Sequence, residues 1–564
     1  MATTLILSAC LALQAAARTV RSPTPPMGWN SYNTWNCLPS EDKIRTSAQG
    51  LIDLGLDKAG YNFVTVDCGW PSEDRDAEGK LQWNETLFPS GGKALGDFIH
   101  GLGLDFGLYS GAGYLQCGSE ALPASLGFEQ LDAESFAEWG GDSLKYDPVE
   151  RFQLELRTLL TTRRYDNCYS TSNTTMVDSS SAESQSPARF QHMAAELEAV
   201  DRDIHYYVCQ WGIGTDVGDW AAEIGNTWRI SNDIYNAWRS IWRITNQVVP
   251  YFRHTTVGAF ADMDMLIVGL NALSEEEERF HFGMWAINKS PLIIGAALDP
   301  ERISQSSLAI MENKEVIAIN QDALAQQAML VRRDTEEEWD IWMGKLSGSR
   351  MVLGVANWKN DSQSVNFDLA SLGIASADAR DVWAAKDAGA LSGTQTVDLA
   401  GHELRLWILS NIVEAAPLQS GSYNSATNAS LSGPAHVFSC ASGTCLPTGS
   451  KIEYIDRSSS VIFSNVSAPS AGKNLVGVDF VNYEYAFTTA WEWGDNTRNM
   501  TIAVNGAEAK RWAFPLSGGD WQESLRLHIE VDGFGEGTEN MVEFRGYGDS
   551  FAPDLVGFEI LSSI

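Results

Sequence analysis

Acidic and polar side chains follow several apolar runs in the first half of the chain. Each stands at or just after the predicted end of a β-strand, as Asp67 does in VTVDCGW and Asp233 does in WRISNDI. The full set is Asp67, Asp147 or Asp166, Gln210, Arg229 with Asp233, and Asp262 with Asp264. In a parallel barrel the carboxyl ends of the strands meet at one face, and active sites lie there. The pattern therefore predicts one site built by several strands.

Carboxylates with aromatic residues nearby suit the hydrolysis of glycosidic bonds. That reaction needs one ionised carboxylate and one protonated carboxylic acid on either side of an oxocarbenium-like centre. The sequence has no His and Cys pairing at metal-ligand spacing, no phosphate-binding Gly-Lys-Ser/Thr loop and no Gly-x-Ser-x-Gly elbow. Aspartates at strand ends also cap helices, so the pattern alone leaves a structural interpretation open.

The elements that must position these residues run from residue 26 to about residue 325. Short apolar runs such as YNFVTVDCGW and DIHYYVCQWG alternate with amphipathic stretches such as EDKIRTSAQGLIDLGLDKAG. Repeated strand-then-helix units indicate an α/β fold with a parallel sheet, either a (β/α)8 barrel or a doubly wound sheet. The polar residues at the ends of successive strands favour the barrel.

Two further domains are predicted after the barrel. Short alternating strands such as RMVLGVANWK and HELRLWILS indicate an antiparallel β-domain over residues 326–412. A stretch rich in Ser, Ala, Asn and Gly follows, and residues 420–564 again consist of strands and turns, as in a jelly-roll β-sandwich. The predicted barrel domain spans residues 24–325.

The charge of the chain excludes several classes of partner. The 564 residues carry a formal net charge of −34, and the sequence pI is about 4.5. Such a surface repels nucleic acid and anionic membranes and suits acidic surroundings. No apolar run after the N-terminus is long enough to span a bilayer.

Several features predict that the protein is secreted. Residues 1–17 resemble a secretory signal peptide, with an apolar run followed by small residues. Removing it would leave seven cysteines, an odd number, so at least one thiol stays unpaired within the chain. Sites for N-glycosylation are predicted at Asn84, Asn173, Asn288, Asn360, Asn428, Asn465 and Asn499.

The motifs TPPMGWNSYNTW, VTVDCGW, WNETLFPSG, LKYD…NCYS, WRISNDI and KSPLIIGAAL resemble the signature segments of glycoside hydrolase family 27. They occur in that family's order over roughly residues 24–300, and the β-domain that follows is similar too. The resemblance is to the secreted fungal α-galactosidases. It implies an exo-acting enzyme that releases terminal α-D-galactose from oligosaccharides and galactomannan with retention of configuration. It implies no cofactor and no metal at the site.

The resemblance also assigns roles to individual residues. Asp233 corresponds to the aspartate that protonates the leaving oxygen and then deprotonates water. The residues that correspond to the sugar-binding positions are Trp29, Tyr32, Asp67, Trp70, Tyr109, Lys145, Gln210, Trp211, Arg229 and Asp264. Many relatives carry Glu where this chain has Gln210. An N-acetylgalactosaminide is disfavoured because Gln210 and Trp211 leave little room for an acetamido group, whereas a β-L-arabinopyranoside stays open as a substrate.

The position of the nucleophile is doubled in this sequence. Tyr146-Asp147 and Tyr165-Asp166 repeat each other, and deleting residues 148–166 leaves LKYDNCYS. We predict that residues 148–166 derive from an unspliced intron. If they are present in the protein, Asp147 is favoured over Asp166, because Asp147 keeps the unbroken strand GGDSLKYD. A carbohydrate-binding protein without catalysis is the alternative if the insertion disables the site.

By resemblance, Cys37 pairs with Cys68 and Cys117 pairs with Cys168. Cys440 and Cys445 are expected to close a small loop in the last domain, which leaves Cys209 as a buried thiol without a role.

The last domain resembles the family 35 carbohydrate-binding modules. Its candidate contacts are Trp491, Trp493, Trp521, Asp549 and Asp554. Such modules often hold a structural calcium ion, although the sequence has no contiguous calcium loop. A stabilising sandwich without a ligand is the alternative, and the oligomeric state is not predicted.

Overall fold

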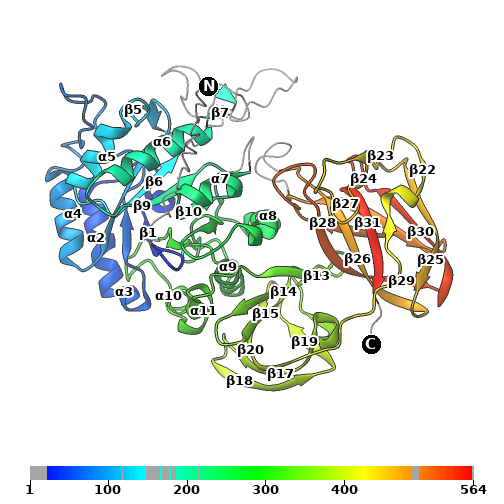
Figure 1. Cartoon of the computed structure of the whole chain (residues 1–564). Helices are drawn as coiled ribbons and strands as arrows, with labels where there is room; N and C mark the ends of the chain where they lie inside the picture. Colours follow the sequence, from blue (N-terminus) through cyan, green and yellow to red (C-terminus); the bar gives the residue numbers. More distant parts are fainter. Residues whose placement is uncertain are drawn as a thin grey trace, which may run out of the picture.

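The computed structural model describes residues 22–116, 119–147, 166–167, 177–178, 186–211, 216–485 and 495–561. Figure 1 shows three bodies along the chain: a barrel in blue to green, a β-domain in yellow-green and a second β-domain in yellow to red. The predicted signal peptide and residues 148–165 lie outside the described residues.

Eight parallel strands form the first body. They are β1 (Met27–Asn30), β2 (Phe63–Thr65), β3 (Asp105–Gly111), β6 (Ser143–Asp147), β9 (His205–Cys209), β10 (Thr227–Arg229), β11 (Phe260–Asp262) and β12 (Leu292–Ile294). Neighbours in the sheet follow one another in the chain, and β12 pairs with β1. Just beyond β11, Leu266 pairs in parallel with Ile294, which joins the last two strands and closes the ring. The predicted (β/α)8 barrel is confirmed.

Helices connect these strands. The longer ones are α2 (Glu41–Asp53), α4 (Gly91–Gly101), α5 (Glu129–Glu138), α6 (Ser186–Ala199), α7 (Val217–Ile224), α8 (Trp238–Val248) and α9 (Glu275–Ile287). The shorter ones are α1 (Tyr32–Trp35), α3 (Leu56–Ala59), α10 (Gln305–Met311), α11 (Lys314–Asn320) and the 3-10 turn η1 (Val249–Arg253). Side-chain caps start several of them, as Ser274 does in a capping box with Glu277. Among the described helices, none has the length and apolar character needed to cross a membrane.

Two short hairpins lie outside the barrel sheet. One joins β4 (Leu115–Gln116) to β5 (Ser119–Pro123), and the other joins β7 (Asp166–Asn167) to β8 (Val177–Asp178).

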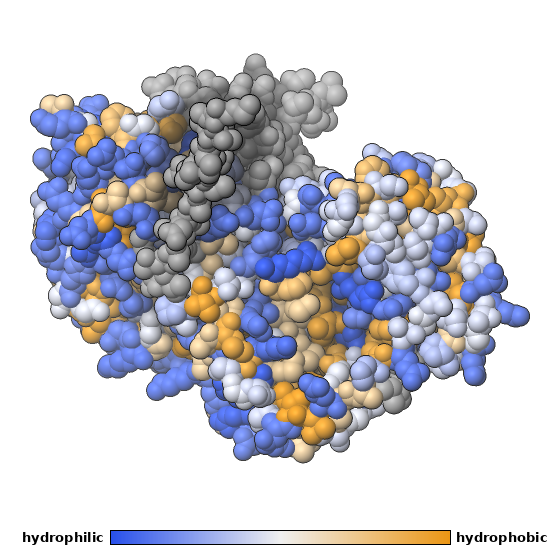
Figure 2. Space-filling view, in the orientation of Figure 1, coloured by the Kyte–Doolittle hydropathy of each residue, from blue (hydrophilic) through white to orange (hydrophobic). Residues whose placement is uncertain are grey.

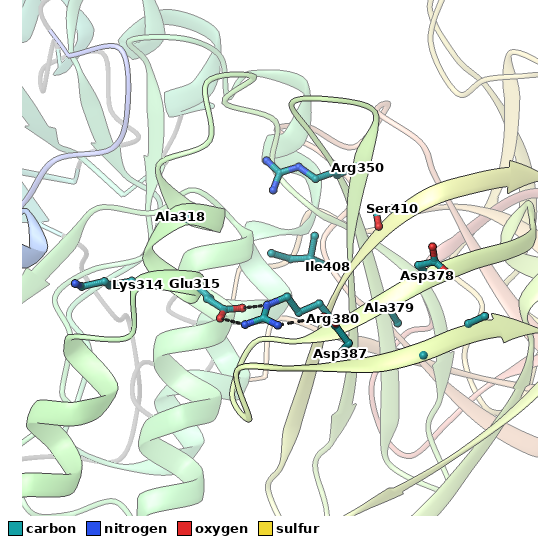
Figure 3. A pocket seen from close by; sticks show the side chains of 12 residues that line it. Lys314, Glu315, Ala318, Arg350, Asp378, Ala379, Arg380, Asp387, Ile408 and Ser410 are labelled. Carbon is teal, nitrogen blue, oxygen red and sulfur yellow. Dashed lines mark hydrogen bonds and ion pairs between the residues drawn. The ribbon is translucent and has the colours of Figure 1, made fainter.

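An antiparallel β-domain follows the barrel. Its main sheet holds β13 (Met329–Asp334), β14 (Trp339–Leu346), β15 (Arg350–Asn357), β20 (Leu404–Glu414), β17 (Ile374–Asp381) and β18 (Lys386–Ser392), with β16 (Gln363–Asp368) and β19 (Thr394–Leu399) paired separately and the turn η2 (Leu369–Leu372) between β16 and β17. Figure 3 shows the cleft of about 710 Å³ where this domain meets α11. There Arg380 donates to the Glu315 carboxylate at 2.6 and 2.8 Å and joins the two domains.

The third domain is a β-sandwich. One sheet holds β23 (His436–Ser439), β24 (Ser450–Glu453), β31 (Asp554–Leu561), β26 (Gly472–Val481) and β29 (Leu525–Phe534), with β21 (Asn424–Ser425) beside β31 and the turn η3 (Ala426–Asn428) after it. The other holds β22 (Ser430–Ser432), β25 (Ser460–Ala468), β30 (Gly537–Gly546), β27 (Arg498–Val504) and β28 (Lys510–Phe514). Between the sheets, the rings of Phe463, Phe544 and Phe558 pack with centroids 5.0–5.8 Å apart.

The three domains meet at one cleft of about 650 Å³, and the face drawn in Figure 2 is hollowed between them. Arg333 lines this cleft and contacts all three domains. Its guanidinium forms two hydrogen bonds of 2.7 Å with Asp340, and it also donates to the side chain of Asn246 in α8 and to the carbonyl of Ala513 in the third domain. Arg333 and Asp340 are both buried, so the pair is a fixed junction.

Replacing Arg333 with Ala should destabilise the protein by about 3–5 kcal/mol, because the substitution leaves the buried Asp340 carboxylate without its cation. Urea unfolding followed by circular dichroism measures the change. Arg457→Ala is the matched control, since Arg457 and its partner Asp549 are both exposed, and it should leave the unfolding midpoint unchanged. Equal midpoints for the two variants would show that Arg333 is not a junction.

Candidate active site

A lysine lies between two buried aspartates at the carboxyl ends of β2 and β6. Lys145 Nζ is 2.9 Å from Asp67 Oδ2 and 3.9 Å from Asp147 Oδ2. Asp67 also accepts hydrogen bonds from the side chain of Asn30 at 2.8 Å and from the backbone N–H of Cys68 at 2.9 Å. These donors fix the Asp67 carboxylate, and Lys145 joins it to Asp147.

The buried carboxyl of Asp147 holds its proton more tightly than an ordinary aspartate does. Its burial raises the pKa of the carboxyl to about 7, Lys145 acts in the opposite direction, and the negative charges of Asp233 and Asp67 raise it further. Burial opposes the charge on Lys145 as well, but Asp67 and Asp147 outweigh that effect and raise the pKa of the ammonium well above its ordinary value. Lys145 therefore stays charged and favours the ionised form of Asp147.

A second ionic cluster lies across the site, after β10 and β11. Arg229 Nη2 is 2.8 Å from Asp264 Oδ2 and 3.1 Å from Asp233 Oδ1. Asp264 is buried and accepts from the backbone N–H groups of Ile234 and Met265. The Asp233 side chain keeps 35% of its surface exposed, whereas that of Asp264 keeps 3%. Of the two carboxylates on Arg229, Asp233 is therefore the one that a ligand can reach.

The two clusters face each other. The charge of Asp233 raises the pKa of the buried Asp147 carboxyl, and it is the largest cause of the raised pKa of Tyr32, followed by burial. Two carboxylates that influence each other across a site, one buried and one half-exposed, can divide the roles of nucleophile and acid.

Besides Trp211, four aromatic residues were predicted to line the site. The Lys145 ammonium lies 5.5 Å from the ring centre of Tyr32 and 5.4 Å from that of Tyr109. Trp29 is fully buried, and its Nε1 donates to the carbonyl of Ala296. Trp70 is fully buried in an aromatic cluster with Trp83 and Trp139 and donates to the carbonyl of Tyr109. The structure thus places Tyr32 and Tyr109 beside the charged Lys145. Contacts of Trp29 and Trp70 with a sugar stay a prediction.

Cys209 is a site residue that the sequence did not reveal. It ends β9, is buried without a disulfide partner, and hydrogen-bonds with the Asp147 carboxylate, which lowers the pKa of Asp147. Its sulfur accepts from Trp211 Nε1 at 3.3 Å and lies 3.9 Å from Arg229 Nη1. Burial raises the pKa of the thiol well above its ordinary value, so the thiol keeps its proton and can donate it in the hydrogen bond. Gln210, which lies between Cys209 and Trp211 in the chain, is buried as well.

The two candidates for the doubled aspartate occupy different elements. Asp147 ends β6, which pairs with β3 and β9 inside the barrel. Asp166 begins β7, which pairs only with β8 among the strands that the structure describes, and Figure 1 draws β7 apart from the barrel strands. Asp147 therefore lies in the same sheet as Asp67 and Arg229.

Two predicted disulfides are present, Cys37–Cys68 and Cys440–Cys445. The first ties the segment after β1 to Cys68, the neighbour of Asp67. Cys117 and Cys168 lie outside the described residues, as does the glycosylation candidate Asn173.

The prediction of a glycan on Asn288 is wrong. Its side chain is fully buried and donates to the carbonyl of Met284 at the end of α9, so a sugar has no room there. The candidates Asn84, Asn360, Asn428, Asn465 and Asn499 are at least partly exposed.

Two candidate contacts of the third domain, Trp521 and Asp554, both lie against Lys451, whose Nζ donates to the Trp521 carbonyl at 2.7 Å and to the Asp554 carboxylate. Trp491 and Trp493 lie outside the described residues, and Trp521 is 36% exposed. Asp554 accepts from Lys451 Nζ at 2.5 Å, and Asp549 is 3.0 Å from Arg457. Each carboxylate thus already has a cationic partner, and the pair does not fit a calcium ion, which takes 6–8 oxygen ligands.

Comparisons with known proteins agree with this geometry. A family model described as alpha galactosidase A matches residues 24–158 and 161–322, and one described as alpha galactosidase C-terminal beta sandwich domain matches residues 336–409. The chain is 37% identical to probable alpha-galactosidase D of Aspergillus fumigatus and 34% identical to alpha-galactosidase D of Emericella nidulans, over 95% of each chain in both cases.

Solved structures give the same result. Alpha-galactosidase I of Mortierella vinacea superposes with a TM-score of 0.62 at 30% identity, over 70% of this chain and 99% of the other. A Saccharomyces cerevisiae alpha-galactosidase solved with raffinose gives a TM-score of 0.59 at 26% identity, over 69% and 97%. These two proteins therefore lack a counterpart for part of this chain.

The raised pKa of Asp147 predicts that Asp147→Asn stabilises the protein at high pH. A carboxyl whose pKa rises from about 3.9 in the unfolded chain to about 7 in the folded protein binds its proton more tightly when folded. The contribution of Asp147 to the free energy of unfolding is then greatest below about pH 4, and it is lost as the pH rises to about 7. The variant lacks this loss, so its free energy of unfolding at pH 8 should exceed that of the wild type by about 2 kcal/mol or more.

Urea unfolding at pH 5 and pH 8 measures this difference, which should shrink at the lower pH. Asp549→Asn serves as the control, because Asp549 is 91% exposed. If Asp147→Asn were the less stable protein at pH 8, the Lys145 charge would outweigh the cost of burial.

Proposed function

The chain belongs to the alpha-galactosidase A family of glycoside hydrolases, and on that premise we propose that it is a retaining exo-α-galactosidase. It removes terminal non-reducing α-D-galactose from galacto-oligosaccharides and galactomannan. The observation that carries the proposal is the pairing of a buried aspartate beside Lys145 with a half-exposed aspartate beside Arg229, across one site. Retention requires such a pair of carboxyls about 5–5.5 Å apart.

In the proposed mechanism Asp147 is the nucleophile. It attacks the anomeric carbon and forms a covalent galactosyl ester, while Asp233 gives its proton to the leaving oxygen. Water then enters, Asp233 takes up a proton from it, and the oxygen of that water replaces Asp147 on the sugar. Lys145 favours the ionised form of Asp147 that the attack needs. The burial that raises the pKa of Asp147 to about 7 leaves the carboxylate weakly solvated, and therefore more reactive once it is ionised.

The sugar contacts follow from the donors and acceptors around these two residues. Asp67 and Lys145 would bind adjacent hydroxyl groups, because their charges are already paired at 2.9 Å. Gln210 and Trp211, at the end of β9, would bound the side of the sugar next to Cys209. The yeast alpha-galactosidase solved with raffinose supports a galacto-oligosaccharide as substrate.

Secretion and a carbohydrate-binding role of the third domain belong to the same proposal. The signal-like residues 1–17 and the disulfides Cys37–Cys68 and Cys440–Cys445 support export. The exposed ring of Trp521 supports sugar binding by the third domain.

Hydrolysis of p-nitrophenyl α-D-galactopyranoside by the full-length protein tests the function. On a natural substrate such as raffinose, activity should fall by a factor of about 10³ or more in Asp233→Asn. That variant can neither protonate the leaving group nor deprotonate the incoming water. Proton NMR of the first product should show α-galactose. The N-acetylgalactosaminide and the β-L-arabinopyranoside are parallel substrates, and faster turnover of either would reassign the substrate. Absence of turnover on all three would instead favour a binding protein.

The nucleophile can be identified by trapping. A fluorinated α-galactoside that slows the second step should leave a galactosyl group on one aspartate, and peptide mass mapping should locate it on Asp147. The same map reports whether peptides from residues 148–166 exist in the secreted protein. A label on Asp166 would overturn the assignment.

A further inference from the structure

The third domain reaches the floor of the catalytic site. Tyr485 and Leu516, which come from two of its loops, form one buried apolar cluster with Cys209 and Trp211 of the barrel, and Tyr483 packs against it. Each of the first four residues is no more than 3% exposed. Because Trp211 donates to Cys209 and Cys209 hydrogen-bonds with Asp147, this cluster connects the third domain to the proposed nucleophile.

Trp211 has an unusual backbone. Its φ of 72° lies in the left-handed region, which costs about 1 kcal/mol or more for a large side chain. Such a conformation persists only where the surroundings fix it. Its N–H donates to the carbonyl of Arg229 at 3.0 Å and its indole donates to Cys209, while Leu516 and Tyr485 share its buried cluster.

The loop that carries Leu516 is held rigidly by the third domain itself. The fully buried Asn482 donates from its side chain to the carbonyls of Phe514 and Pro515 at 3.1 and 3.0 Å. The backbones of Asn482 and Ser517 are also hydrogen-bonded to each other. Leu516 therefore enters the cluster with Trp211 from a loop that is fixed by hydrogen bonds.

The barrel in turn holds the same loop in place. Leu516 N–H donates to the carbonyl of Asn246, and Arg253 donates to the carbonyls of Ser517 and Ser524, both at 2.7 Å. The approach is so close that a Cβ on Gly519 would lie 2.2 Å from Asp216 in the barrel. On the other side of the cluster the hydroxyls of Tyr485 and Tyr251 are 3.3 Å apart.

We propose that Leu516 and Tyr485 are positioning residues for the catalytic site. They hold Trp211, and through it Cys209, against Asp147, so the third domain completes the wall of the sugar pocket. This inference rests on the proposed function. It gives the last domain a part in the reaction itself, in addition to any binding of polysaccharide.

Leu516→Ala in the full-length protein tests the proposal. Removing the side chain should let the Trp211 ring move, and kcat/KM for p-nitrophenyl α-D-galactopyranoside should fall about tenfold or more, because small displacements beside reacting groups are costly. Leu516→Met, which keeps the volume, should restore activity to within about twofold. Tyr485→Phe, which removes the hydroxyl that lies 3.3 Å from that of Tyr251, is the milder second variant.

The matched control is Leu527→Ala. Leu527 is 2% exposed in the core of the third domain and belongs to a different cluster, so its loss destabilises the same domain without touching Trp211. It should change kcat/KM by less than about twofold. Equal losses in Leu516→Ala and Leu527→Ala would overturn the proposal, because the effect would then come from stability alone.

A second readout does not depend on activity. The rate at which iodoacetamide alkylates Cys209, followed by peptide mass mapping, should rise in Leu516→Ala and stay at the wild-type value in Leu527→Ala. If the wild type hydrolyses no galactoside, the proposed function fails while this measurement still decides whether the third domain covers Cys209. Unchanged alkylation in Leu516→Ala would overturn the inference in either case.

Discussion

Two buried cations hold the catalytic end of the barrel together. Strand ends bring Asp67, Asp147, Asp233, Asp262 and Asp264 into one region, and like charges at that distance repel strongly where water is excluded. Lys145 compensates the first two, and Arg229 bridges Asp233 and Asp264. Every other feature of the site, from the tyrosines beside Lys145 to the thiol beside Arg229, is arranged around these two positive groups.

The two proposed catalytic carboxylates differ in burial, since Asp147 is buried and Asp233 is partly exposed. Asp147 shares Lys145 with Asp67, and its burial keeps the pKa near 7, so the site stores energy in that carboxylate. Asp233 shares Arg229 with Asp264 but remains in contact with solvent. A fixed buried carboxylate and a reachable exposed one form the asymmetry that a two-step displacement requires.

Much of this could be predicted from sequence, because strand-then-helix periodicity and strand-end aspartates are local signals. The barrel and the gathering of strand-end residues such as Asp67 and Asp233 at one face follow from such signals and from family motifs. Cys209 could not be assigned a role in this way, because its importance comes from Leu516 and Tyr485, which lie about 280–310 residues away in the chain and contact it only through the domain interface. Asn288 shows the opposite error, since a sequon carries no information on burial.

The cluster of Cys209, Trp211, Tyr485 and Leu516 also constrains how the protein is made. A ribosome adds about 5–20 residues per second and domains fold as they emerge, so the barrel is complete roughly 10–40 s before Leu516 is synthesised. During that interval the apolar wall around Trp211 has no cover. The newly made barrel therefore carries an exposed apolar patch beside its catalytic site until the last domain is synthesised, and aggregation is a risk during that interval.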